Sequence, residues 1–148
     1  LVHPSDGFAR IVDSGLYTDG AYAEDLKLPF DAPLVMNGRS VILQASRKIP
    51  RAIATLLERH RRRAADVAVF VMHQANQNLI VRVAQALEVA EDKFYSNIKR
   101  FGNTSSASML IAAAEWSRTH SLQPGETLCF AGFGAGFHWG ALLAEGAE

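Results

Sequence analysis

The chain has 148 residues, 49% of them hydrophobic, and its 15 basic side chains balance its 15 acidic ones. That length and hydrophobic content allow one buried core and a single domain, while the balanced charge gives no field that would attract nucleic acid or an anionic membrane. The single cysteine excludes an internal disulfide framework and a multi-cysteine metal site, and no apolar run approaches the ~20 residues that span a bilayer.

The first part of the chain predicts a short leader followed by a strand. Residues 1–10 are turn-rich and begin without methionine, which we interpret as the start of a processed or excised piece of a longer protein. Nothing there resembles a signal peptide, and the shortage of cysteine suits a reducing cytoplasm. Loose alternation predicts a strand over residues 11–18, and prolines with an Asn-Gly pair make residues 29–38 irregular.

A helix is expected from Gly38 to His60. Its apolar positions recur at helical spacing along one face: Val41, Ile42, Ala45, Ile49, Ile53, Leu56 and Leu57. Pro50 lies inside this pattern and predicts a kink or a short break, because a proline within a helix costs ~3 kcal/mol.

The second part of the chain alternates strands and helices, which predicts one α/β layered domain. Residues 66–72 are a continuous apolar run of strand length, typical of a strand buried on both faces, and they lead into His73. The elements expected after it are a helix from Asn76 to Leu87, a strand-like segment over 94–98, an Ala-rich helix after 102–105 that ends near His120, a turn at Pro124-Gly125, and two strands over about 126–132 and 137–144.

Two short polar motifs stand at the ends of these elements. His73-Gln74-Ala75-Asn76 follows the buried strand, beyond whose carboxyl end the binding sites of open α/β sheets lie. Gly102-Asn103-Thr104-Ser105 precedes the Ala-rich helix. An imidazole and a carboxamide brought together there could both donate hydrogen bonds to one carbonyl oxygen, which is how a protein stabilises a thioester enolate.

Each of these side chains also has a plainer interpretation. His73 could be a structural or solvated histidine. Asn103 and Asn76 could be helix N-caps, since asparagine is a preferred residue there, and for Asn76 a cap and a functional role are compatible. If Thr104 or Ser105 supplied the cap instead, the carboxamide of Asn103 would be free.

Three further features favour structural explanations. Cys129 stands inside a predicted strand without a basic neighbour, so we expect a small buried hydrophobe rather than a nucleophile. The basic run over residues 59–63 complements the dipole at a helix C-terminus and is weak evidence for nucleic-acid binding. Residues 132–140 are not a dinucleotide fingerprint, because a strand follows the glycines; they predict a tight strand–turn–strand in which another backbone approaches closely.

Together these motifs, ending in Phe133-Gly134-Ala135-Gly136-Phe137-His138-Trp139-Gly140, resemble the C-terminal half of a beta-ketoacyl-acyl-carrier-protein synthase III, a thiolase-fold condensing enzyme. The resemblance covers nearly the whole chain and is strongest from His73 onward. It implies that residues 1–148 form a C-terminal thiolase-like domain, an α/β half domain with a mixed sheet of about five strands layered between helices. The family's nucleophilic cysteine lies on an N-terminal half, which we expect to be absent from this chain.

The resemblance also implies catalytic roles. In the family, the residues that match His73 and Asn103 donate hydrogen bonds to the malonyl thioester oxygen, and the histidine acts in its neutral form. A backbone N–H at the position of Ala135, where the family usually has glycine, joins the oxyanion hole.

Binding roles follow in the same way. Gly38, Ile42 and Asn76 match positions along the channel for CoA and its pantetheine arm. Contacts to the carrier protein would come from Gln74, Ala75, Asn76, Gln77 and Asn78. On that helix Asn78 replaces the usual arginine and Gln85-Ala86 replace a typical basic pair, leaving only Arg82, so the use of a carrier stays open.

The implied activity is the decarboxylative Claisen condensation of an acyl group from acyl-CoA with a malonyl thioester, at the start of fatty acid biosynthesis, without a cofactor or metal. The implied partners are the N-terminal half of the same protein, an acyl carrier protein and a second copy in a homodimer. Two alternatives stay open: acyl transfer or polyketide-type condensation in secondary metabolism, and an inactive folding or interaction module. The isolated chain is expected to have no turnover.

Overall fold

The computed structural model describes residues 7–147. The strands are β1 (Ala9–Thr18), β2 (Leu26–Lys27), β3 (Val35–Met36), β4 (Val69–Met72), β5 (Thr127–Gly134) and β6 (His138–Gly146). The α-helices are α1 (Gly38–Arg59), α2 (Gln77–Ala86), α3 (Ile98–Phe101) and α4 (Ser108–Trp116), and short 3₁₀ turns lie at Gly20–Tyr22, Ala64–Asp66, Glu91–Lys93 and Ser105–Ala107.

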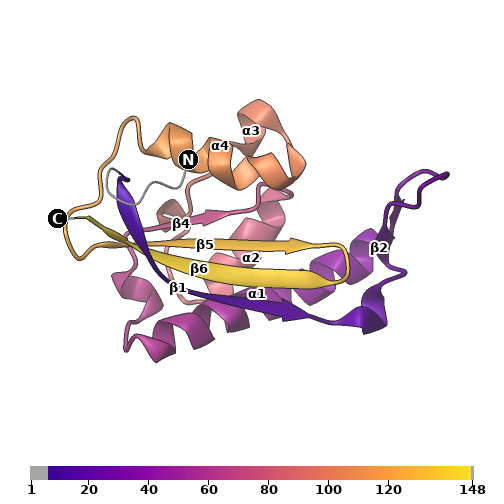
Figure 1. The fold of residues 1–148 in the computed structure, drawn as a ribbon, viewed down its shortest axis with the longest axis horizontal. Coiled ribbons are helices and arrows are strands. Elements are labelled where there is room, and N and C mark those ends of the chain that lie inside the picture. The colour runs from indigo at the N-terminus through magenta and orange to yellow at the C-terminus, as the bar shows by residue number, and fades with distance from the viewer. Residues whose placement is uncertain (1–6, 148) are drawn as a thin grey trace.

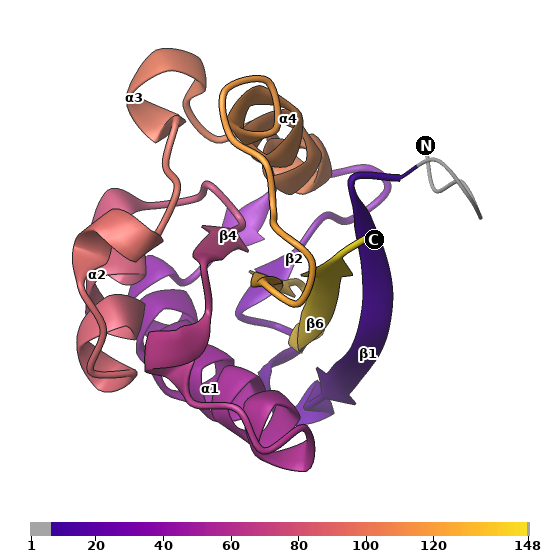
Figure 2. The same ribbon diagram turned by 90° about the vertical axis from the view of Figure 1, so that its left-hand side faces the viewer.

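Four strands form the main sheet of the described residues, in the order β1-β6-β5-β4, and β2 pairs with β3 at one end of the molecule (Figure 1). β4 is parallel to β5, whereas β6 runs antiparallel to both β5 and β1. Helices α1 and α2 cover one face of this sheet, and α3 and α4 lie on the other (Figure 2). The predicted layering between helices is therefore confirmed.

The core lies on both faces of β4, as the apolar run predicted. Phe70 and Met72 belong to the cluster beneath α1 and α2, while Val69 and Val71 belong to the cluster beneath α4. Because both faces are covered, the strand needs no polar alternation. It begins at Val69 rather than at residue 66, since a 3₁₀ turn occupies Ala64–Asp66.

Helix α1 confirms the long helix predicted from the first half of the sequence. Of the expected apolar face, the fully buried positions are Ala45, Ile49, Ile53, Leu56 and Leu57. Val41 and Ile42, near the start of the helix, are half-buried. Of the kink or short break predicted at Pro50, the break is wrong: the helix continues through this residue, which is itself buried.

The fifth strand predicted over residues 94–98 is also wrong. Phe94 makes one isolated parallel bridge to Phe70, and the chain then turns into α3. The buried side chain of Gln74 explains the departure, because its Oε1 accepts the backbone N–H of Asn97 at 3.1 Å and withdraws that group from strand pairing. The Ala-rich helix ends at Trp116 rather than near His120, while the helix after Asn76 and the last two strands lie where predicted.

Helices long and apolar enough to cross a membrane do not occur in the described part of the chain.

Candidate functional site

The site is built at the carboxyl ends of the two parallel strands. Met72 of β4 lies opposite Ala131 of β5, and the backbone N–H of His73 donates to the carbonyl of Ala131 at 2.9 Å. A Cβ added to Gly132 would come 3.9 Å from the Cβ of His73. His73 therefore lies beside Gly132 of β5, and it follows a buried parallel strand as the sequence predicted.

The imidazole of His73 is held by the first residue of α4. Its Nδ1 lies 2.6 Å from Oγ of Ser108, and the same oxygen accepts the backbone N–H of Gln74 at 3.1 Å. Burial lowers the pKa of His73 below its ordinary value, because desolvation disfavours the charged ring. The ring is therefore neutral near pH 7, the form in which one nitrogen donates and the other accepts.

Asn103 lies on the loop that leads into α4. Its Oδ1 accepts the backbone N–H of Ser105 at 2.9 Å, and positive φ angles at Gly102 (65°) and Ser105 (54°) shape the turn around it. The capping alternative fails for α4, whose N-cap is Ala107. Because the turn occupies the amide oxygen, the Nδ2 group keeps its two hydrogens for another acceptor, and it bonds to none of the described residues.

These contacts connect two motifs that are far apart in the sequence. The chain runs from Asn103 through the turn Ser105–Ala107 directly into Ser108, which binds the His73 ring. Ser108 is the contact of the His73 ring that the sequence did not predict. The sequence places several serines before the Ala-rich helix, and no local pattern indicates which of them would contact His73.

Ala135 lies on the exposed turn between β5 and β6, and its φ is not positive. Phe137 anchors this turn: its ring is fully buried and stacks on Tyr22 with 5.2 Å between ring centroids. Its backbone also exchanges two hydrogen bonds of 2.8 Å with Asp19 at the end of β1. The turn that presents the Ala135 N–H is thus held from both sides.

Asn76 caps α2, as one of its two interpretations predicted. Its Oδ1 accepts backbone N–H groups of Asn78 at 2.9 Å and Leu79 at 3.3 Å. Ala75 and Gln77 are half-buried, and Asn78 is exposed. These positions leave α2 with an accessible start next to His73.

The predicted contact of Gln74 with a carrier protein needs a correction. Only 1% of its surface is exposed, and its Nε2 donates to the carbonyls of Met72 at 2.8 Å and Tyr95 at 3.3 Å. A buried amide whose hydrogen bonds are all internal cannot touch a carrier protein. Gln74 instead fixes the chain around the site.

Gly38 and Ile42, the other predicted channel residues, lie half-buried in the first turns of α1. Asn37 caps this helix by accepting the N–H of Ser40 at 3.2 Å, and its Nδ2 donates to Asp25 at 3.2 Å. Neither Gly38 nor Ile42 makes a side-chain hydrogen bond to another described residue, so their place along a channel stays a prediction.

The structural interpretation of Cys129 is confirmed. Cys129 is fully buried in β5, and burial raises the pKa of its thiol to about 12, so it carries no thiolate at neutral pH. Two side chains of the basic run at the end of α1 bond to acidic groups of the sheet: Nε2 of His60 lies 2.8 Å from Oδ2 of Asp13, and Arg62 pairs with Glu145 at 2.6 Å.

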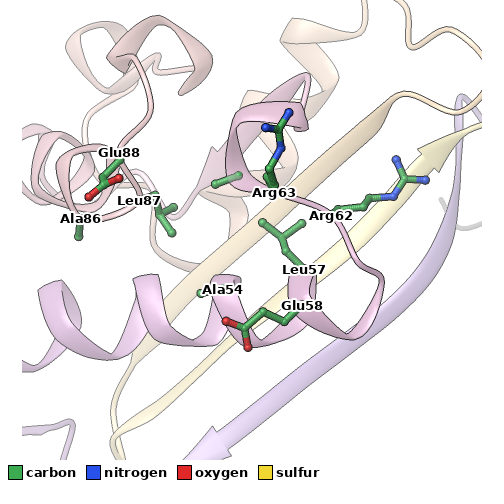
Figure 3. A pocket seen from close by; sticks show the side chains of 9 residues that line it. Ala54, Leu57, Glu58, Arg62, Arg63, Ala86, Leu87 and Glu88 are labelled. Atoms are coloured by element: carbon green, nitrogen blue, oxygen red, sulfur yellow. The ribbon is translucent and has the colours of Figure 1, made fainter.

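Two depressions on the surface lie away from His73. The one in Figure 3, about 290 Å³, opens between the ends of α1 and α2 and is lined by residues such as Leu57, Arg62 and Glu88. The other surrounds Gly125 and Glu145. Neither of these two depressions is lined by His73 or Asn103. Within residues 7–147, no group of His, Cys, Asp and Glu side chains could hold a metal ion.

Comparison with known proteins identifies the family to which the chain belongs. Residues 57–145 match the family described as 3-oxoacyl-[acyl-carrier-protein (ACP)] synthase III C terminal. Beta-ketoacyl-[acyl-carrier-protein] synthase III of Oleidesulfovibrio alaskensis is 34% identical over 157 aligned positions, which cover 95% of this chain and 48% of the relative. The protein of that name in Lactobacillus delbrueckii subsp. bulgaricus is 41% identical over 114 positions, covering 77% and 36%.

Solved structures agree with the sequence match. The 3-oxoacyl-[acyl-carrier-protein] synthase III from Aquifex aeolicus VF5 has a TM-score of 0.88 at 28% identity, covering 95% of this chain and 46% of that one. The enzyme from Pseudomonas aeruginosa PAO1 has a TM-score of 0.86 at 30% identity, covering 93% and 44%. The chain thus spans about half the length of these relatives, or less. It has the thiolase-type α/β fold and belongs to the family of 3-oxoacyl-[acyl-carrier-protein] synthase III C-terminal domains.

Proposed function

We propose that this chain is the C-terminal catalytic half of a 3-oxoacyl-[acyl-carrier-protein] synthase III. The complete protein would transfer an acyl group from acyl-CoA to a cysteine, forming a thioester. A malonyl thioester would then lose carbon dioxide, and its enolate would attack the acyl carbonyl. His73 and Asn103 are the proposed donors to the malonyl thioester oxygen, where negative charge develops in the transition state.

One observation carries this proposal: a neutral imidazole and an oriented carboxamide border the same helix start. Ser108 holds the ring of His73, and the N–H of Ser105 holds the oxygen of Asn103, so each side chain keeps a donor for an outside acceptor. Donors whose positions are set before the substrate arrives stabilise charge without reorganisation. The N–H of Ala135 is the proposed donor of the oxyanion hole.

The other half of the site is proposed to lie on a segment upstream of this chain. Cys129 is unsuited as the nucleophile, because its thiol is buried in the sheet. On α4 apolar residues are open to solvent: Ala114 is exposed, Leu110 is 71% exposed, and the N-cap residue Ala107 is exposed as well. A helix that is apolar all round is normally buried, and the relatives are long enough to provide a second half that covers it.

The proposed substrates are acyl-CoA and a malonyl thioester, with no cofactor. Asn76, Gly38 and Ile42 are proposed to border the pantetheine channel. The exposed start of α2 at Asn78 is the proposed contact for an acyl carrier protein, although only Arg82 offers it a positive charge. We also propose a homodimer in the cytoplasm, a reducing compartment that suits the lone buried thiol.

Replacing either donor tests the proposal in the complete protein. Asn103→Ala and His73→Ala are each expected to lower the rate of carbon dioxide release from malonyl-CoA or a malonyl carrier by roughly 10²–10³-fold, since each removes one donor. Gln123→Ala is the control, because this exposed residue precedes the opposite end of β5. Near-normal release by Asn103→Ala would contradict its role, and acyl transfer without any carbon dioxide release would favour an acyltransferase of another kind.

A further inference from the structure

The hydroxyl of Ser108 stands between two groups that the site depends on. It is 1% exposed, it lies 2.6 Å from Nδ1 of His73, and it accepts the N–H of Gln74 at 3.1 Å. We propose that Ser108 is a positioning residue that donates its hydroxyl hydrogen to Nδ1 and thereby locks His73 in the tautomer that carries its hydrogen on Nε2.

The count of hydrogens supports this direction. A serine hydroxyl has one hydrogen and two acceptor lone pairs. The backbone N–H of Gln74 can only donate, so it occupies one lone pair. Among the described residues, Nδ1 of His73 is the one remaining partner of this oxygen, and therefore the one acceptor open to the hydroxyl hydrogen. If Nδ1 carried a hydrogen instead, the buried hydroxyl would receive two hydrogens and its own would be left without an acceptor, which costs free energy.

The consequence falls on the other ring nitrogen. With Nδ1 accepting, a neutral imidazole must carry its hydrogen on Nε2. Nε2 bonds to none of the described residues, so this hydrogen is available to a thioester oxygen. A histidine in the opposite tautomer would present a lone pair to that oxygen and repel it. The catalytic meaning of the bond rests on the proposed function, whereas the tautomer itself does not.

A purely structural role for Ser108 makes a different prediction. The hydroxyl ties the first residue of α4 to the end of β4, and a bond between elements stabilises the fold whichever way its hydrogen points. Loss of such a tie would lower stability without selecting a tautomer. The two roles are therefore separated by a measurement of the ring itself.

The first experiment measures the protonation of the ring directly and does not depend on an activity assay. ¹⁵N–¹H correlation spectra of the complete protein with labelled histidine report which ring nitrogen carries the hydrogen, and the His73 signals are identified by their absence from His73→Ala. We expect the Nε2–H tautomer in the native protein near pH 7. The Nδ1–H tautomer, or a charged ring, would overturn the proposal even if the protein proves to be a condensing enzyme.

The second experiment removes the hydroxyl. Ser108→Ala is expected to lower kcat for malonyl decarboxylation by about 10- to 100-fold through misplacement of the donor, with KM little changed, and to mix the two tautomers in the spectra. Ser108→Thr keeps a hydroxyl and is expected to restore the Nε2–H tautomer and part of kcat. Ser106→Ala is the matched control, because Ser106 is exposed and its hydroxyl bonds to none of the described residues.

The outcomes separate the inference from the proposed function. An unchanged tautomer in Ser108→Ala would overturn the inference, whatever the rate. The other case is a shifted tautomer in Ser108→Ala together with normal decarboxylation by His73→Ala. That result would support Ser108 as the residue that sets the tautomer, and it would contradict the catalytic role of His73.

Discussion

The polar side chains of the site differ in whether their hydrogen-bonding groups are already used. The amide oxygen of Gln74 accepts the backbone N–H of Asn97, and its Nε2 donates to a backbone carbonyl. The amide oxygen of Asn76 accepts a backbone N–H at the start of α2 and so caps this helix. His73 and Asn103 are each fixed through one atom and keep a donor at the other. This division could not be seen in the sequence, where all four stand in equally polar motifs.

Cys129 gives a prediction at the scale of one residue. Because burial raises its thiol pKa to about 12, the thiol stays protonated from pH 7 to pH 9 and should not react with iodoacetamide in the native protein. Peptide mapping by mass spectrometry should find this cysteine unmodified before denaturation and alkylated after it. Cys129→Ala is expected to cost about 1 kcal/mol of stability and to keep the activity. An acyl adduct on Cys129 would contradict its structural role.

The helices and strands whose sequences show a clear pattern of apolar residues were predicted well. The apolar run of β4 and the helical spacing of α1 and α2 depend on burial alone, and these elements were found within a few residues of their expected ends. The segment from Phe94 to Ile98 is strand-like in composition, and its one bridge to the sheet is at Phe94. What decided against a strand was the side chain of Gln74, which reaches Asn97 from a distant part of the sequence.

The contact between β1 and β6 gives a prediction for these elements. A Cβ at Gly140 would lie 2.7 Å from the carbonyl oxygen of Gly15 and 2.6 Å from Cδ2 of Leu16. Gly140→Ala should therefore cost about 1–3 kcal/mol through overpacking, measured as a lower Tm of the complete protein. Gly134→Ala is the control from the same hairpin, because an added Cβ there meets no atom within 4 Å. Equal melting temperatures for the two variants would contradict the close approach of the strands.

As a whole, the molecule is well packed on the side of α1 and α2, whereas the side of α4 exposes apolar residues to solvent. The face beneath α1 and α2 is covered by a packed core, and polar contacts of His60 and Arg62 join the end of α1 to β1 and β6. On the opposite side α4 exposes Leu110, and the segment around β2 and β3 exposes further large apolar side chains, including Phe30 at 100%. Exposed apolar patches of this kind mark interaction surfaces.

Leu110 supplies the prediction at this scale. The isolated chain is expected to self-associate, and Leu110→Glu should shift it toward the monomer in size-exclusion chromatography with light scattering. In the complete protein the same change should instead destabilise by roughly 2–4 kcal/mol, because it would bury a charge without a partner. Ala90→Glu, at an exposed position beyond α2, is the control for the added charge. An unaffected Tm for Leu110→Glu in the complete protein would contradict a covered α4.

The sequence by itself determined the α/β class, the buried parallel strand that ends at His73, the structural nature of Cys129 and the family, because burial periodicity and contiguous motifs are written locally in the chain. Only the tertiary structure decided that the sheet keeps four strands, that Gln74 is internal and that Ser108 holds the ring of His73. Each of these depends on a hydrogen bond or a packing contact between segments that are distant in sequence, and no local pattern specifies which of several polar side chains will meet once the chain has folded.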